Sequence, residues 1–167
     1  MRIAFEVLTV ILVASTMGLA LAHALEWPGK LRLDREQYLA VQPIYYPGFT
    51  IGGGVAEAGG MLATLALLLM TPGGSGAFWL TAGALAALIV MHLIFWTVTQ
   101  PVNKAWLRET TLAAPARRFF GTGGADSADR SPAADWTILR DRWERSHAVR
   151  AAAAMLSLVL LVTAIAL

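Results

Sequence analysis

The chain has no cysteine and little charge. None of its 167 residues is Cys, so disulfides, thiolate metal sites and cysteine nucleophiles are excluded. Only 14% of the residues are Asp, Glu, Lys or Arg, whereas a soluble domain carries about 25%. A bundle of this size would need more charged surface to stay in water, so the composition indicates a membrane protein.

Four hydrophobic segments are long enough to cross a bilayer, which takes roughly 20 apolar residues. They cover residues 3–25, 51–70, 77–99 and 148–167. Hydrophobic residues make up 57% of the whole chain. These segments predict an all-α fold, an integral membrane four-helix bundle that forms a single domain over residues 1–167. The lipid bilayer is its expected partner.

The positive charge indicates membrane orientation rather than nucleic-acid binding. Lys and Arg are concentrated in residues 26–50 and 100–147, between apolar runs, and are absent from the turn at 71–76. The positive-inside rule places both basic connections in the cytoplasm and both termini on the opposite side. We take the membrane to be the bacterial inner membrane, and we expect no nucleic-acid partner.

The longer basic connection contains a stretch typical of a flexible linker. Residues 121–134 are rich in Gly, Ser, Asp and Pro. We expect helix to resume near Ser131 or Asp135 and to continue to about residue 166. At 1.5 Å per residue this helix would be roughly 48 Å long, longer than the hydrocarbon core. The last helix therefore has a long predicted cytoplasmic extension.

Small residues recur at four-residue spacing in the second segment. Gly52, Ala56 and Gly60 share one helix face, with Gly59 and Ala63 beside them. Such a face lets membrane helices approach closely. The glycines follow no phosphate-binding pattern, so we interpret them as a packing surface.

Ionisable residues gather in one half of the predicted bundle. The segments HALE and ERSH place His23 with Glu26, and Glu144 with His147, on shared helix faces. Ionisable groups within a span are costly and usually face the bundle interior or a cavity. We therefore predict a shared polar site at the cytoplasmic end. The alternative is that Glu144 pairs with an arginine on its own helix surface.

The sequence leaves the ligand of this site open. A mononuclear metal site would use two or three histidines and one glutamate. Two Glu-x-x-His segments on facing helices are typical of di-iron bundles, and two histidines on different helices can ligate a haem. No motif distinguishes a metal ion from a haem. The candidate metal ligands are His23, His92, His147 and Glu57.

Aromatic residues crowd the same end of the predicted bundle. An interfacial belt accounts for most of them. The alternative is that they line a pocket for a flat, apolar ring. The ten residues are Trp27, Tyr38, Tyr45, Tyr46, Phe49, Phe95, Trp96, Trp106, Trp136 and Trp143.

Three stretches resemble a family of small four-span membrane proteins. They are HALEWPGKLRLDREQYLAVQPIYY, PVNKAWLRE and WTILRDRWERSHAVRAA, and the resemblance covers nearly the whole chain. Many members are described only as a domain of unknown function, and some as anthrone oxygenase-like, after fungal members that act in aromatic polyketide synthesis. The matching positions are His23, Glu26, Pro28, Tyr45, Pro101, Asn103, Trp136, Leu139, Arg140, Arg142, Trp143, His147 and Arg150.

The resemblance implies an oxidoreductase that acts on a quinone-like or polyaromatic substrate. Fungal members are credited with oxidising an anthrone methylene to a quinone carbonyl with dioxygen. Such a reaction needs a base, a carboxylate that orients the base, and a cation that stabilises the enolate. The resemblance implies His147 or His23 as the base. It implies Glu144 or Glu26 as the orienting carboxylate, and Arg140 or Arg150 as the cation.

A non-catalytic role is the competing hypothesis. The small size, the small-residue face and the cytoplasmic helix that carries Trp136 and Trp143 suit an accessory or assembly subunit of a larger membrane complex. A homo-oligomer is equally compatible with these features. A transporter ranks last, because no internal repeat is visible in the sequence.

Overall fold

The structure, a computed structural model, describes residues 1–106 and 136–167, and every regular element in these ranges is helical. Two turns, η2 and η3, are π-helical, and η1 is a 3-10 helix. The predicted all-α class is confirmed, and the predicted linker at 121–134 lies outside the described residues. The elements are α1 (Arg2–Lys30), α2 (Arg35–Val41), η1 (Gln42–Tyr45), η2 (Gly48–Gly52), α3 (Gly53–Met70), α4 (Gly76–Ile94), η3 (Phe95–Thr99), α5 (Gln100–Trp106) and α7 (Trp136–Ala166).

Four continuous helical stretches are long and apolar enough to cross a membrane, which makes the chain an integral membrane protein. Each coincides with one predicted span and begins before or ends beyond it. The last has 31 residues and is therefore about 46 Å long, so the predicted extension of the final helix is confirmed. The stretches are Arg2–Lys30, Gly48–Met70, Gly76–Trp106 and Trp136–Ala166.

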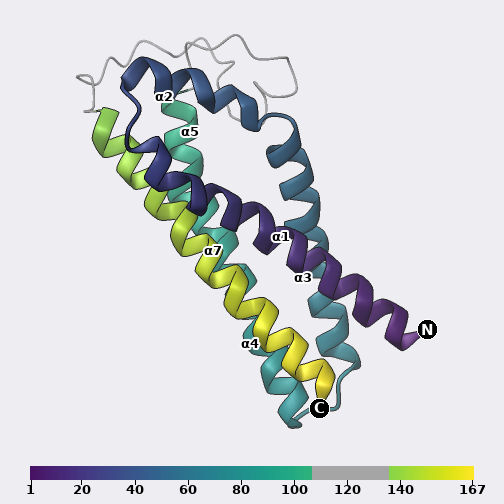
Figure 1. The fold of residues 1–167 in the computed structure, drawn as a ribbon. Coiled ribbons are helices and arrows are strands. Elements are labelled where there is room, and N and C mark those ends of the chain that lie inside the picture. The colour runs from purple at the N-terminus through teal and green to yellow at the C-terminus, as the bar shows by residue number, and fades with distance from the viewer. Residues whose placement is uncertain (107–135) are drawn as a thin grey trace.

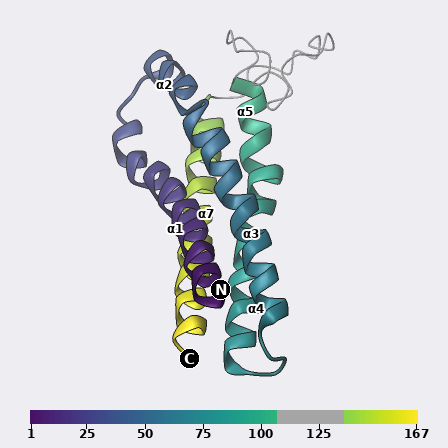
Figure 2. The same ribbon diagram turned by 90° about the vertical axis from the view of Figure 1, so that its right-hand side faces the viewer.

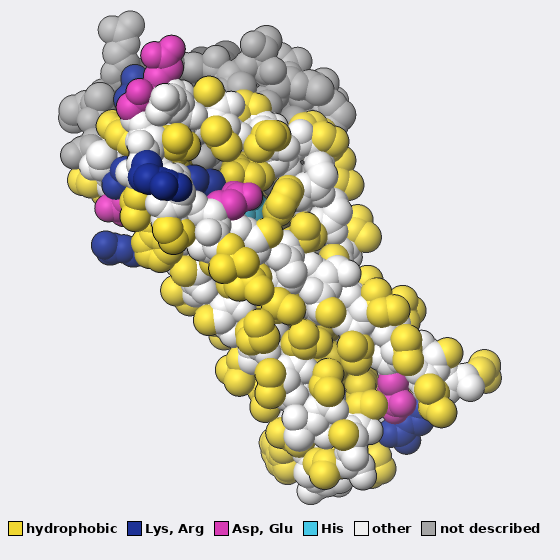
Figure 3. Space-filling model, in the orientation of Figure 1, with side chains coloured by type: hydrophobic (Ala, Val, Ile, Leu, Met, Phe, Trp, Pro, Cys, Tyr) yellow, Lys and Arg dark blue, Asp and Glu magenta, His cyan; other side chains and the backbone are white. Residues whose placement is uncertain are grey.

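The four spans form a closed bundle. α7 packs along α1 and α4, and α3 packs against the same two helices. Both termini lie toward one end of the bundle, with the turn between α3 and α4, while α2 and α5 lie at the other (Figures 1 and 2). We call this second end, with residues 26–50, α5 and the beginning of α7, the polar end. Charged side chains gather there, and the flank below is largely apolar (Figure 3).

The half of the bundle away from the polar end has a dry core. It is built from Val13, Leu67, Ala84, Leu88 and Leu161, all at most 3% exposed. On the neighbouring α1–α3 contact, a Cβ atom at residue 60 would lie 3.5 Å from Val13 Cγ2 and 3.7 Å from backbone atoms of α1. Glycine at this position therefore lets the two helices approach closely, as the small-residue spacing predicts.

The two π-helical turns lie where the second and third spans reach the polar end. η3 is followed by Pro101, which has no N–H to bond the carbonyl of Thr97 four residues earlier. π-turns widen a helix locally and are frequent at functional sites. Residues of both η2 and η3 line the cavity described next.

Candidate active site

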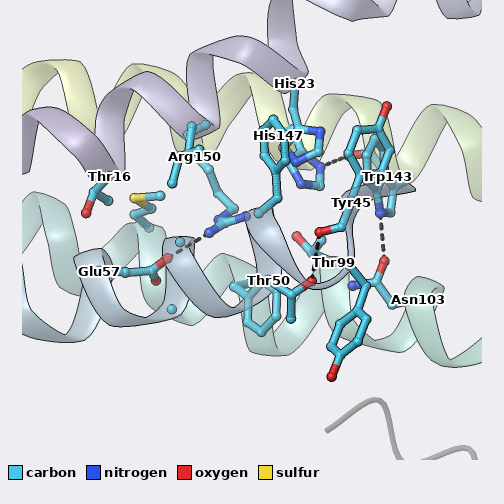
Figure 4. A pocket seen from close by; sticks show the side chains of 18 of the residues that line it. Thr16, His23, Tyr45, Thr50, Glu57, Thr99, Asn103, Trp143, His147 and Arg150 are labelled. Carbon is cyan, nitrogen blue, oxygen red and sulfur yellow. Dashed lines mark hydrogen bonds and ion pairs between the residues drawn. The ribbon is translucent and has the colours of Figure 1, made fainter. Parts of the chain in front are cut away.

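A cavity of about 290 Å³ lies between the four spans near the polar end. Every span contributes to its wall, and η1 and α5 add residues such as Tyr45 and Asn103 beside Trp143 (Figure 4). Seven of the ten aromatic residues predicted at this boundary line the cavity, so they form a pocket wall and not only an interfacial belt. They are Tyr45, Tyr46, Phe49, Phe95, Trp96, Trp106 and Trp143.

His23 and His147 meet at the cavity wall. Their ring centroids are 4.4 Å apart, and both residues are buried. His147 Nδ1 lies 3.0 Å from the carbonyl oxygen of Trp143. Because a carbonyl can only accept, Nδ1 carries the proton, and in the neutral ring Nε2 keeps the lone pair. His23 Nδ1 is buried with no hydrogen-bond partner.

Trp143 holds the histidine pair from the side of α7. Its ring lies 3.9 Å from that of His147 and 5.2 Å from that of His23. The indole Nε1 donates a 2.8 Å hydrogen bond to Asn103 Oδ1 on α5. The hydrogen bond fixes the indole, and the packed rings restrict rotation of both imidazoles.

A buried lysine stands behind the pair. Lys30 is 5% exposed, and its Nζ lies 2.9 Å from Glu26 Oε2 and 3.7 Å from Glu144 Oε1. The 2.9 Å contact with Glu26 is an ion pair. Its angle is not that of a hydrogen bond, because Lys30 Nζ has no hydrogen-bond partner. Nζ also lies over the rings of Tyr45 and Trp143, at 4.8 and 4.6 Å from their centroids. One cation therefore compensates two carboxylates.

Each of these carboxylates also accepts a hydrogen bond from a tyrosine. Tyr38 donates to Glu144 Oε1 and Tyr45 to Glu26 Oε2, both at 2.7 Å. Burial, reinforced by the Glu144 charge, raises the pKa of Tyr38. Burial and the bond to Glu26 raise the pKa of Tyr45. Both phenols therefore stay protonated at neutral pH and act as donors.

A second cluster of polar side chains joins α3, α4 and α7, on the opposite side of the cavity from Lys30. Arg150 donates to Glu57 Oε2 at 2.8 Å, and Glu57 Oε1 lies 2.9 Å from His92 Nδ1. Trp96 Nε1 donates to His92 Nε2 at 2.9 Å, so His92 is neutral and its Nδ1–H faces the carboxylate. Arg150 Nε is buried without a hydrogen-bond partner.

The structure brings most of the predicted site residues together. The cavity wall includes His23, His92, His147, Glu57 and Arg150. The two remaining carboxylates, Glu26 and Glu144, stand behind the wall, where they contact Lys30.

One candidate residue lies outside the cavity wall, and the alternative placement of Glu144 differs from the structure. Arg140 does not line the cavity: it forms an ion pair with Asp141 at 2.8 Å and packs on Trp136. Glu144 is fully buried and turns to Tyr38, so it does not pair with an arginine at the helix surface.

The histidines and glutamates do not fit the metal or haem site that the sequence left open as an alternative. The four candidate ligands divide into two pairs, His23 with His147 and Glu57 with His92. Arg150 occupies the second oxygen of Glu57. Within residues 1–106 and 136–167, no three His, Cys, Asp or Glu side chains are grouped to hold a metal ion. Two imidazole rings in direct contact also leave no room for a haem between them.

The sequence matches the anthrone oxygenase family over residues 46–160. The match includes His147 and Arg150 and begins after His23, Glu26 and Lys30. No curated protein and no solved structure matches the chain.

Proposed function

Because the chain belongs to the anthrone oxygenase family, we propose that it is a membrane oxygenase acting on a quinone-like or polyaromatic substrate. The observation that carries the proposal is the composition of the cavity wall, where aromatic rings surround a histidine pair and a buried arginine. The cavity volume of about 290 Å³ lies near the lower limit of small-molecule pockets, roughly 300–1,000 Å³.

The reaction converts a methylene group that is conjugated with a ketone through the aromatic rings into a second carbonyl. A base removes one methylene proton, and the resulting enolate gives its electrons to dioxygen. The peroxide anion that forms takes up one proton, which balances the proton removed by the base. The hydroperoxide then loses water, so that the CH₂ group and one O₂ give one C=O and one H₂O. The protein has to supply the base and a donor for the enolate oxygen.

We assign the base to His147 and the oxyanion donor to Arg150. The bond from His147 Nδ1 to the Trp143 carbonyl leaves the lone pair on Nε2. Arg150 lines the cavity, and its Nε–H is buried without a hydrogen-bond partner, so its guanidinium is the group that we propose donates to a substrate oxygen. The ion pair with Glu57 keeps the guanidinium in place.

Glu26 connects the histidine pair with water at the polar end. His23 contacts His147, and its Nδ1 lies 3.9 Å from Glu26 Oε2. The Glu26 side chain is 40% exposed. The proposed route for proton exchange therefore runs between His147 and water at the polar end, through His23 and Glu26, and the proton released along it is balanced by the one that the peroxide takes up.

The proposal is tested by dioxygen consumption in purified protein with anthrone as the probe. His147→Ala is expected to lower the turnover rate by about 100-fold or more, because general-base catalysis contributes about 10²–10⁴. The uncatalysed reaction of anthrone with oxygen is subtracted with protein-free nanodiscs. A wild-type rate no higher than that background would refute an oxygenase role.

We also propose that the polar end faces the cytoplasm of a bacterial inner membrane, which follows from the basic residues around α2. Because the chain has no cysteine, a single introduced thiol reports its own side. In intact cells a membrane-impermeant maleimide is expected to label Ser75→Cys in the turn before α4, and not Arg32→Cys. The reverse pattern would invert the topology.

One argument for the competing role, that of an accessory subunit, does not agree with the structure. That hypothesis used Trp136 and Trp143 as a docking surface on the last helix. Trp143 is 3% exposed and lines the cavity, so it is not available to a partner.

A further inference from the structure

The cavity has an opening on the side of the bundle. Of the residues that line it, two are exposed, Gly54 on α3 and Trp96 on η3. The hydrogen bond between Glu57 and His92 joins these helices one turn deeper. Gly54 and Trp96 therefore stand on opposite sides of one opening between the second and third spans.

The route from the polar end is covered by η1 and its neighbours. Gln42 and Trp143 are at most 8% exposed, and the hydrogen bonds Tyr45–Glu26 and Trp143–Asn103 tie this cover to α1 and α5. The chain between α1 and α3 crosses that end of the bundle (Figure 1).

The opening lies at the edge of the hydrocarbon layer. At 1.5 Å per residue, Gly54 is about 24 Å along its helix from Met70, and Trp96 is about 30 Å from Gly76. Both distances start at the turn between α3 and α4. Since a hydrocarbon core is about 30 Å thick, the opening is within reach of a molecule dissolved among lipid chains.

The surface of the opening carries no formal charge. Gly54 has no side chain, and a Cβ atom there would meet nothing within 4 Å. Trp96 presents an indole whose N–H is held by the neutral His92. A charged molecule would lose its hydration here without a counter-charge at the entrance, whereas a neutral aromatic ring would not.

We propose that the substrate enters sideways from the bilayer, between Gly54 and Trp96, and is an uncharged aromatic compound dissolved in the lipid. The chemical class of the substrate rests on the proposed function, and the entry route rests on the geometry of the opening. The indole of Trp96, which donates a hydrogen bond to His92, forms one side of the entrance, and Gly54 forms the other.

The test compares Gly54→Phe with Gly18→Phe in lipid nanodiscs. Gly18 is an exposed glycine of α1 that has equally open space around its Cβ position and does not line the cavity. The probe is 9,10-anthraquinone, whose binding is followed by quenching of tryptophan fluorescence. For Gly54→Phe, we expect association and dissociation rates to fall together by about tenfold, with the Kd nearly constant. Gly18→Phe should bind at the wild-type rates.

Gly54→Ala and Gly54→Leu extend the test if the phenylalanine variant does not fold. The rates should fall in order of side-chain size. The charged probe anthraquinone-2-sulfonate should not bind to the wild type from water. Unchanged rates across the series, or rapid binding of the sulfonate, would overturn lateral entry and leave the oxygenase proposal standing. A wild-type protein that does not bind anthraquinone would overturn the proposed aromatic substrate itself.

Discussion

The two halves of this bundle are built from the same helices, but they bury different kinds of polar group. In the half near the termini, the buried polar groups include hydroxyls such as Thr9 and Thr81, which bond to carbonyls of their own helices. In the half near the polar end, the buried groups include charged and imidazole side chains, among them Lys30, Glu144 and Arg150. The first half is a scaffold, and the second half carries buried charge around a cavity.

This difference indicates where stability and activity should separate. The apolar half gains from close packing of small and aliphatic side chains. The polar half keeps buried atoms of ionisable side chains without partners, including His23 Nδ1, Glu144 Oε2 and Arg150 Nε, whereas in the apolar half the hydroxyl of Thr64 is such an atom. Unpartnered buried polar atoms cost stability, and a catalytic role is one reason why a folded protein keeps them. Substitutions in the apolar half should therefore lower stability, and substitutions at the cavity in the polar half should lower the turnover number.

The largest effect on stability is expected from Lys30→Met. The substitution leaves the fully buried Glu144 without its cation, and breaking a buried ion pair costs about 3–5 kcal/mol. Unfolding in detergent by a chemical denaturant measures the loss. The double variant Lys30→Met/Glu144→Gln should recover part of it. Equal stability of the single and double variants would show that the Lys30–Glu144 charges are not coupled.

The next largest effect is expected from the matched pair Arg150→Gln and Arg140→Gln on α7. Arg150 lines the cavity and Arg140 lies outside it. Removal of the oxyanion donor should lower the turnover number by about 100-fold, while Arg140→Gln should retain the wild-type value. Anthrone oxidation in nanodiscs measures both. Equal losses in the two variants would remove Arg150 from the proposed reaction.

A smaller effect is expected from Gly60→Leu, in the apolar half. The larger side chain would press against Val13 and the backbone of α1, and overpacking costs about 1–3 kcal/mol. Thermal unfolding should show the loss, while the turnover number of the molecules that remain folded stays near the wild-type value. Gly18→Leu, at an open position, is the control and should melt with the wild type.

The smallest effect is expected from Tyr45→Phe. The variant removes the 2.7 Å hydrogen bond to Glu26 and keeps the ring beside His23. Slower proton transfer through Glu26 should lower the turnover number by at most about tenfold, which corresponds to the loss of a hydrogen bond to a charged group worth about 1.5 kcal/mol. A solvent isotope effect that is larger in the variant would locate the change in proton transfer. An identical isotope effect would argue against this route.

The sequence was sufficient to predict the spans and the gathering of His23, His147, Glu57 and His92. Those predictions depend on helix length and on the cost of ionisable groups in lipid, which are visible one segment at a time. The family resemblance pointed to Arg140 and Arg150 equally. Only the tertiary structure distinguishes them, because Arg140 forms an ion pair with its neighbour Asp141, whereas Arg150 forms one with Glu57 on another helix.

The contacts of Lys30 and Tyr38 with Glu144 could not be predicted from the sequence, for physical reasons. Lys30 follows Glu26 by four residues, a spacing typical of an ion pair on a helix face, yet at a span boundary it was counted only as an orientation signal. Tyr38 lies 106 residues from Glu144, so no local pattern joins them. It reaches the site because Asp34 and Gln37 cap the start of α2 in a capping box.

The most direct test of the division into scaffold and site measures two quantities in two variants. For His147→Ala and Leu88→Ala, the rate of anthrone oxidation per folded molecule and the melting temperature are determined in the same nanodiscs. The account predicts that His147→Ala loses about 100-fold in rate with little change in melting temperature. It predicts that Leu88→Ala melts at a lower temperature and keeps the wild-type rate. If the rates of both variants instead followed their melting temperatures, His147 would be a structural residue and the cavity would not be the site of oxidation.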